Sequence, residues 1–181
     1  MKKRKRTFSK YNAKKQQWLR NAEKFVLLCV AIFLLFQYVL GVKVIEGASM
    51  ESSLTDGDIV FFTRLFNPCE RGQVVAFDAP NGDHYAKRIV AVAGDIVNLQ
   101  DGVLYINGKP EAGDYQQYIV GETNPEGTTV TYPFRVAEGN VFILGDNRND
   151  SLDSRSFGQV STHSVNGTLH VRLGWLYINF M

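Results

Sequence analysis

An uncharged apolar run near the N-terminus constrains this chain more than any other feature of its sequence. The run is FVLLCVAIFLLFQYVLGV, residues 25–42, and Gln37 is its only strongly polar side chain. As a helix it would be about 27 Å long, close to the roughly 30 Å hydrocarbon core of a bilayer. A buried soluble helix normally keeps a polar stripe, and a cleaved secretory signal usually has a shorter apolar core. The run therefore predicts a transmembrane helix over 25–42, with the lipid bilayer as a partner.

The charge of the chain changes sign across this run. The net charge is only +2, yet residues 1–24 carry ten Lys and Arg against one acid, whereas residues 43–181 carry ten against seventeen. Because basic flanks stay on the cytoplasmic side of a span, the pattern predicts a cytoplasmic leader over 1–24 and an extracytoplasmic domain over 43–181. The leader adjoins the apolar run and has few interleaved aromatic residues, so no nucleic-acid partner is expected.

The sequence after residue 43 is typical of short strands. Apolar runs bounded by Gly, Asp, Asn or Pro lie at 59–62, 73–77, 84–92, 95–99, 103–108, 129–134, 140–144 and 168–173. Asp101-Gly102 suits a type I′ turn, whose two central residues need positive φ, and it predicts a hairpin over 98–108. The polar stretch 109–128 is expected to be an excursion from the core. The predicted fold class is mostly β, with packed antiparallel sheets or a barrel and one N-terminal transmembrane helix.

Several kinds of chemistry find no support in the sequence. Cys29 lies inside the predicted span and Cys69 outside it, so the two cannot form an intramolecular disulfide. His84, His163 and His170 are far apart in the chain, and neither Cys lies near a second soft ligand, so neither a metal nor a cofactor is expected. The sequence also contains no nucleophile elbow beside a His and no phosphate-binding loop.

A lysine within a strand pattern is the strongest candidate for a reactive group. In HYAKRIVAV, residues 84–92, Lys87 shares one face with mostly apolar neighbours. Such a lysine can lie at a sheet edge with its amine in water; if it is buried, desolvation lowers its pKa and the neutral amine can act as a general base. The best placed nucleophile is Ser49, which follows a Gly-Ala pair that lets a substrate backbone approach closely. A serine cluster of this kind is also common in simple turns.

Three segments taken together resemble the type I signal peptidase family of membrane-anchored Ser/Lys endopeptidases. GASMESSLTDGDIV is similar to the serine box of that family, and YAKRIVAVAGD is similar to its lysine box. GDNRNDSLDSRSFG, residues 145–158, is similar to its Gly-Asp-Asn-Arg…Ser-x-Asp-Ser-Arg…Gly box, the most specific of the three. With the N-terminal span the resemblance covers essentially the whole chain, and the short length is similar to that of the Gram-positive-type members.

The resemblance implies a role for each matching residue. Ser49 would be the nucleophile, Lys87 its general base, and Ser151 a second hydroxyl that orients the lysine amine. The residues implied to support the site through hydrogen-bonded ion pairs are Asp146, Asp153, Arg88 and Arg155. The implied substrate-binding residues are Gly47, Met50 and Tyr85. The implied function is cleavage of signal peptides from exported preproteins after small residues in an Ala-x-Ala-like pattern.

This chain departs from the family pattern at three places. Ser52 stands where the serine box usually has Pro, and residues 91–95 lack the Pro that usually precedes Gly-Asp in the lysine box. These losses are expected to remove conformational restriction while keeping the reacting groups. Gly47 offers no side-chain hydroxyl to an oxyanion hole, which leaves the backbone N–H of Ser49 to supply it. The altered serine box keeps open an alternative, a non-catalytic membrane factor that assists assembly of exported subunits.

Overall fold

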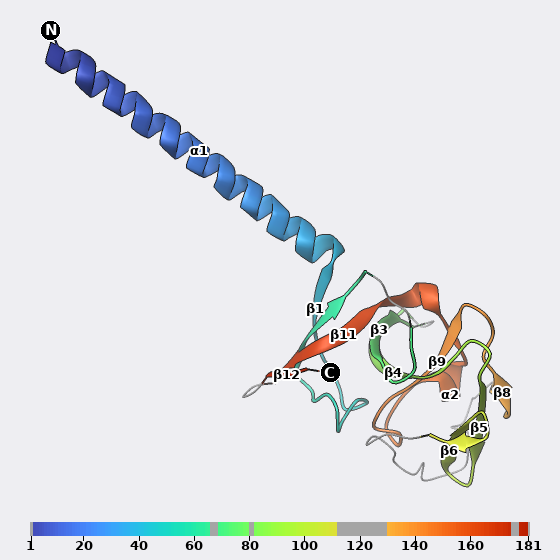
Figure 1. Ribbon diagram of the computed structural model, residues 1–181. Helices are drawn as coiled ribbons and strands as arrows, with labels where there is room; N and C mark the ends of the chain where they lie inside the picture. The colour runs from blue at the N-terminus through green and yellow to red at the C-terminus, as the bar shows by residue number, and fades with distance from the viewer. Residues whose placement is uncertain (1, 66–68, 80–81, 112–129, 175–177, 181) are drawn as a thin grey trace. The chain divides into compact units, whose positions relative to one another are not determined.

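The computed structural model describes residues 2–65, 69–79, 82–111, 130–174 and 178–180. The chain divides into two compact units, Met1–Val39 and Leu40–Met181. The first unit is helix α1, Lys2–Tyr38, which ends four residues before the predicted helix does because Leu40–Val44 form strand β1 instead (Figure 1). By length and hydropathy together, none of the helices in the described ranges qualifies as a membrane span.

The second unit is mostly β, and its larger sheet has the strand order β1-β2-β11-β3-β4-β9-β10, with β12 paired to β11 (Figure 1). Its strands are β1 Leu40–Val44, β2 Ile59–Thr63, β3 Val74–Asp78, β4 His84–Val92, β9 Asn140–Leu144, β10 Val160–Ser161, β11 Val165–Leu173 and β12 Ile178–Phe180. Each pair of neighbours is antiparallel. The expected mostly β, antiparallel fold class is therefore confirmed.

A smaller antiparallel sheet has the strand order β7-β6-β5-β8. Its strands are β5 Ile96–Gln100, β6 Val103–Ile106, β7 Lys109–Pro110 and β8 Phe134–Arg135. The predicted hairpin is present, and Asp101 and Gly102 have φ of 49° and 75°, as a type I′ turn requires. Two short helical segments follow β9, namely α2, Ser154–Phe157, and a 3₁₀ turn, Thr162–Ser164.

The predicted strands are confirmed where the apolar pattern is strong, and they fail where it is weak. Strands β4 and β9 have the predicted bounds. The strand predicted over 129–134 is wrong for its described residues up to Pro133, because only Phe134–Arg135 pair, with β5. Of the predicted excursion, residues 112–129 lie outside the described residues, while Lys109–Pro110 form β7.

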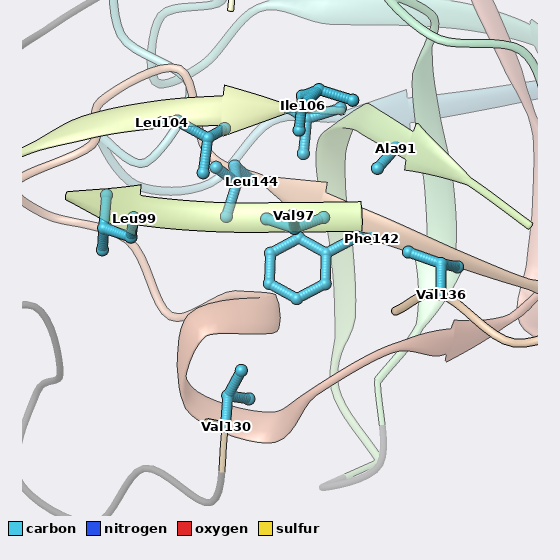
Figure 2. Close-up of a cluster of buried hydrophobic side chains, with 10 residues drawn as sticks. Ala91, Val97, Leu99, Leu104, Ile106, Val130, Val136, Phe142 and Leu144 are labelled. Carbon is cyan, nitrogen blue, oxygen red and sulfur yellow. The ribbon is translucent and has the colours of Figure 1, made fainter. Parts of the chain in front are cut away.

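Buried side chains cover both faces of the central strands. Along β9, Val141 and Ile143 belong to one apolar cluster while Phe142 and Leu144 belong to another, as the period of two in a strand requires. The second cluster joins the two sheets, since Phe142 packs there with Val97 of β5 and with the other side chains shown in Figure 2. Strands buried on both faces read as continuous apolar runs.

Replacing Phe142 with Ala should lower the free energy of unfolding by about 3–5 kcal/mol, because the ring is fully buried where the two sheets meet. Urea unfolding followed by circular dichroism measures the change. Val44→Ala is the control, because Val44 is half exposed and its loss should change stability by no more than about 0.5 kcal/mol. A loss below about 1 kcal/mol for Phe142→Ala would contradict this account of the core.

Candidate active site

Ser49 lies on a turn between β1 and β2 that two apolar side chains hold in the core. Met50 and Leu54 are fully buried, and the Leu54 N–H donates to the Met50 carbonyl over 2.8 Å. A second turn bond, 2.9 Å long, runs from the Glu51 N–H to the Ala48 carbonyl. The backbone on either side of Ser49 is therefore fixed, while the Ser49 side chain remains partly accessible.

Lys87 lies on β4, the strand between β3 and β9, and its side chain is only 1% exposed. Its Nζ donates a hydrogen bond to Ser49 Oγ over 2.5 Å, which joins segments 38 residues apart in the chain. Burial lowers the pKa of the lysine amine from its ordinary 10.5 to about 8, although Asp153 acts in the opposite direction. An appreciable fraction of the amine is thus neutral in mild alkali, and the neutral form can accept the Ser49 proton.

Tyr85 forms part of the wall around this amine. It lies two residues before Lys87 on the same face of β4, and Lys87 Nζ is 5.3 Å from the centre of its ring. The ring supplies apolar surface together with a weak attraction for the protonated amine. Tyr85 therefore helps to exclude water from Lys87 without holding its charge as a carboxylate would.

Two buried ion pairs lie behind the Ser49–Lys87 contact. Arg88 donates to both oxygens of Asp146 over 2.8 and 2.7 Å, and Arg155 donates to both oxygens of Asp153 over 2.8 Å each. Both carboxylates have no exposed surface. Asp153 also accepts from the Gly145 N–H over 3.0 Å, so its charge fixes the loop after β9. Buried charges are tolerated when they are paired and hydrogen-bonded in this way.

The loop after β9 binds the backbone of the Ser49 turn directly. The Asn147 N–H donates to the Ser49 carbonyl over 3.2 Å, and its side-chain amide donates to the Ala48 carbonyl over 3.1 Å. A Cβ at Gly145 would lie 2.4 Å from the Ser49 carbonyl oxygen, a contact that no side chain tolerates. Glycine is therefore required at position 145 for the close approach of loop and turn.

Ser151 does not make the contact with Lys87 that the resemblance implied. Its Oγ is buried and has no hydrogen-bond partner among the described residues. It packs against Gly145 instead, where an added Cβ would lie 2.2 Å from it. The structure therefore places the second hydroxyl beside the Ser49 turn, while the lysine amine donates to Ser49 Oγ.

An ion pair that the sequence did not predict joins this loop to the smaller sheet. Arg148 is 2% exposed and donates to both oxygens of Glu111 over 2.7 and 2.9 Å. Arg155 in turn donates to the Arg148 carbonyl over 2.6 Å. Arg148 lies in the charged segment that the sequence singled out, but Glu111 lies in a polar stretch without any pattern that could have indicated its role.

The backbone at Ser52 bears on the Pro that the altered serine box lacks. Ser52 has φ of 85°, a value that the proline ring forbids because it holds φ near −65°. A proline therefore could not occupy position 52 in this turn. The neighbouring Ser53 accepts from Arg88 over 3.1 Å, which ties this turn to the Arg88–Asp146 pair.

A cavity of about 480 Å³ opens beside Ser49, between the Ser49 turn and the start of β4. Ile45, Met50 and Ala86 supply apolar wall, and Ser49 and Tyr85 also line it. Two of the predicted substrate-binding residues, Met50 and Tyr85, thus border this space. Gly47 is exposed, and its N–H donates to Asp56 over 2.8 Å.

Comparison with known proteins gives consistent matches. The model of the family described as "Signal peptidase, peptidase S26" matches residues 17–175. The signal peptidase I of Bacillus licheniformis is 34% identical over 154 residues, covering 80% of this chain and 83% of that protein. The signal peptidase IB of Staphylococcus aureus is 30% identical over 165 residues, covering 83% and 86%. A crystal structure of a signal peptidase I from Enterococcus faecalis, 36% identical, covers 55% of this chain and 95% of that one, with a TM-score of 0.47.

The chain belongs to the signal peptidase family, peptidase S26. The family match spans most of the sequence and includes all three of the segments that carry the resemblance. Membership makes this chain a serine-type peptidase, and thus a hydrolase. The family prediction is therefore confirmed.

Replacing Lys87 with Met should raise the free energy of unfolding at pH 7 by up to about 3 kcal/mol, because folding buries a charged amine whose pKa falls from 10.5 to about 8. Below pH 8 both the folded and the unfolded state are protonated, and the full cost of burial applies. Between pH 8 and 10.5 the folded amine is already neutral, so the cost shrinks and vanishes. Urea unfolding at several pH values should show this gain disappear; a variant less stable than wild type at pH 7 would contradict it.

Proposed function

We propose that this chain is a signal peptidase that cleaves signal peptides from exported preproteins, with Ser49 as nucleophile and Lys87 as its general base. The observation that carries the proposal is the 2.5 Å contact between Ser49 Oγ and an almost fully buried lysine amine. The named relatives, which are signal peptidases from Bacillus and Staphylococcus, support the substrate class. The non-catalytic assembly role has no observation in its favour.

In the proposed reaction one proton passes from Ser49 to Lys87 and then to the leaving group of the substrate. Neutral Lys87 Nζ takes the proton of the Ser49 hydroxyl while Oγ attacks the scissile carbonyl carbon. The resulting ammonium then gives the proton to the leaving amine, which leaves an acyl group on Ser49 for water to hydrolyse. The backbone N–H of Ser49 is the proposed oxyanion donor, a type of contact worth about 2.7–4 kcal/mol of barrier.

The buried ion pairs are proposed to position the reacting groups without touching the substrate. Asp153 and Arg155 hold the Gly145 N–H and the Arg148 carbonyl, and the same loop binds the Ser49 carbonyl through Asn147. A site held in this way keeps nucleophile and base in one geometry. Met50 and Tyr85 are the proposed substrate contacts, since both line the cavity next to Ser49.

Cleavage should be lost in both Ser49→Ala and Lys87→Ala, and the double variant should be no worse than either single one, because nucleophile and base act as a unit. Turnover of a synthetic Ala-x-Ala signal-peptide substrate measures this. Ser151→Ala should cost far less, since Ser151 Oγ makes no bond to Lys87. Near wild-type turnover in either single variant would rule out the dyad.

The pH profile of the same assay separates lysine from histidine catalysis. With a pKa of about 8 for Lys87, kcat/KM should rise with pH through about 8 and stay high in mild alkali. With a histidine base, kcat/KM would rise near pH 6.5 instead. Activity would then be lost when one of the three histidines, His84, His163 or His170, is replaced. Activity that rises only near pH 10.5 would mean that Lys87 is solvated.

We further propose a single-pass topology in which residues 25–42 anchor the chain, residues 1–24 are cytoplasmic and residues 43–181 are outside. Membrane anchorage is a property of the signal peptidase I family. The proposed orientation rests on the net charge, which is +9 for residues 1–24 and −7 for residues 43–181. Protease added to spheroplasts should digest the C-terminal part and spare a tag on residues 1–24. Protection of the C-terminal part from the protease would contradict this orientation.

A further inference from the structure

Arg148 is a buried cation in the loop after β9, and its guanidinium binds in two directions. Its Nε donates to the Gly145 carbonyl over 3.0 Å, and its two terminal nitrogens donate to the Glu111 carboxylate over 2.7 and 2.9 Å. Its own carbonyl accepts from Arg155 over 2.6 Å. Because a planar guanidinium holds a carboxylate through two parallel bonds, both the position and the direction of the Arg148 side chain are fixed.

Glu111 connects this pair to a rigid part of the smaller sheet. The residue follows β7, its N–H donates to the Leu104 carbonyl of β6 over 2.8 Å, and its side chain is 8% exposed. Leu104 belongs to the same apolar cluster as Leu144, the last residue of β9 (Figure 2). The strand before Glu111 and the strand before the loop are therefore packed in one core.

The loop that Arg148 holds is the one that binds the backbone of the Ser49 turn. Asn147, the neighbour of Arg148 in the chain, donates to the Ser49 carbonyl through its N–H and to the Ala48 carbonyl through its side-chain amide. Gly145, whose carbonyl accepts from Arg148, lies close against the Ser49 carbonyl. Both of these loop residues are thus directly next to Arg148 or bound by it.

The same segment carries charges that act on Lys87. Apart from burial, the pKa of the Lys87 amine responds to four groups within residues 146–155, namely Asp153, Arg155, Asp146 and Asp150. The three carboxylates raise this pKa, Arg155 lowers it, and burial, which also lowers it, has the largest effect. A loop that moved away from the Ser49 turn would admit water to the amine. The pKa of Lys87 would then rise towards 10.5, because the largest of these effects would weaken.

We propose that Glu111 is a positioning residue for the cleavage reaction, acting through Arg148 on the loop that binds the Ser49 turn. The proposal rests on the proposed function, because it takes Ser49 and Lys87 as nucleophile and base. In this role Glu111 contacts Arg148 rather than the substrate. The smaller sheet thereby takes part in catalysis, since its carboxylate keeps the loop, and with it the contact between Ser49 and Lys87, in one geometry.

The first test separates positioning from stability with full-length protein in detergent. Glu111→Gln keeps the shape of the side chain and removes its charge. The double variant Glu111→Leu with Arg148→Met replaces the buried pair with apolar side chains, a change that often leaves stability unchanged or raises it. Urea unfolding should therefore show the double variant at least as stable as wild type.

Despite this stability, cleavage of a synthetic Ala-x-Ala signal peptide should be impaired. At pH 8, kcat/KM should fall about tenfold in Glu111→Gln and at least as much in the double variant, since a misplacement of about 1 Å can cost about a hundredfold. Arg148→Met alone should lose as much as the double variant. Glu138→Gln, at an exposed glutamate between β8 and β9, is the matched control and should keep wild-type activity.

The pH profile is a readout that a purely structural role would not move. In wild type, kcat/KM should rise through about pH 8, the pKa of Lys87. In Glu111→Gln and in the double variant the rise should move to higher pH, because water reaches the amine and its pKa lies nearer 10.5. The loss of activity should therefore be largest near neutral pH and should shrink in mild alkali. Glu138→Gln should show the wild-type profile.

The outcomes separate this inference from the function on which it rests. If wild type cleaves the peptide and Glu111→Gln keeps wild-type kcat/KM, the inference fails while the proposed function stands. The inference also fails if activity falls only together with stability while the pH profile stays in place. A further loss on adding Glu111→Leu to Arg148→Met overturns it too, because a residue that acts only through Arg148 has nothing more to lose. If the double variant does not fold, as judged by circular dichroism, Glu111→Gln decides by its activity and pH profile. If wild type cleaves no peptide, the proposed function falls and the inference falls with it.

Discussion

The site of this protein depends on the burial of one amine. Lys87 has 1% of its side chain exposed, and desolvation moves its pKa down to about 8. A lysine in water would remain charged and could accept no proton at neutral pH. The surrounding structure therefore has to exclude water while holding Ser49 Oγ at 2.5 Å. The apolar walls and paired charges around Lys87 meet both requirements.

The paired charges limit how far the pKa of the amine falls. Asp153 and Asp146 favour the charged lysine, and Arg155 opposes it. Because each carboxylate is itself held by an arginine, its charge is partly neutralised and it cannot rotate towards the amine. The same carboxylate that tunes Lys87 also fixes the loop at Gly145 through a backbone bond, so electrostatics and geometry are maintained by one set of contacts.

The sequence predicted those parts of the fold that depend on local pattern. Strand β9 has the predicted bounds because residues buried on both faces give an apolar run, and the Asp101-Gly102 turn was recognisable from its need for positive φ. The start of strand β1, residues 40–42, was hidden within the apolar run, since a strand and a helix end look alike when every residue is apolar. Strand β8 was predicted to begin too early in the chain. Val130 is buried and fits an apolar strand pattern, although it does not pair in the sheet.

For the site itself, the sequence by itself determined which residue types are present and in what order along the chain. Ser49, Lys87 and the charged segment after β9 were all recognisable, together with the family to which they point. Only the tertiary structure decided that Lys87 is buried and that Ser151 packs against Gly145. The reason is that burial and hydrogen-bond choice are set by neighbours from distant segments, and no local pattern records which of them come together.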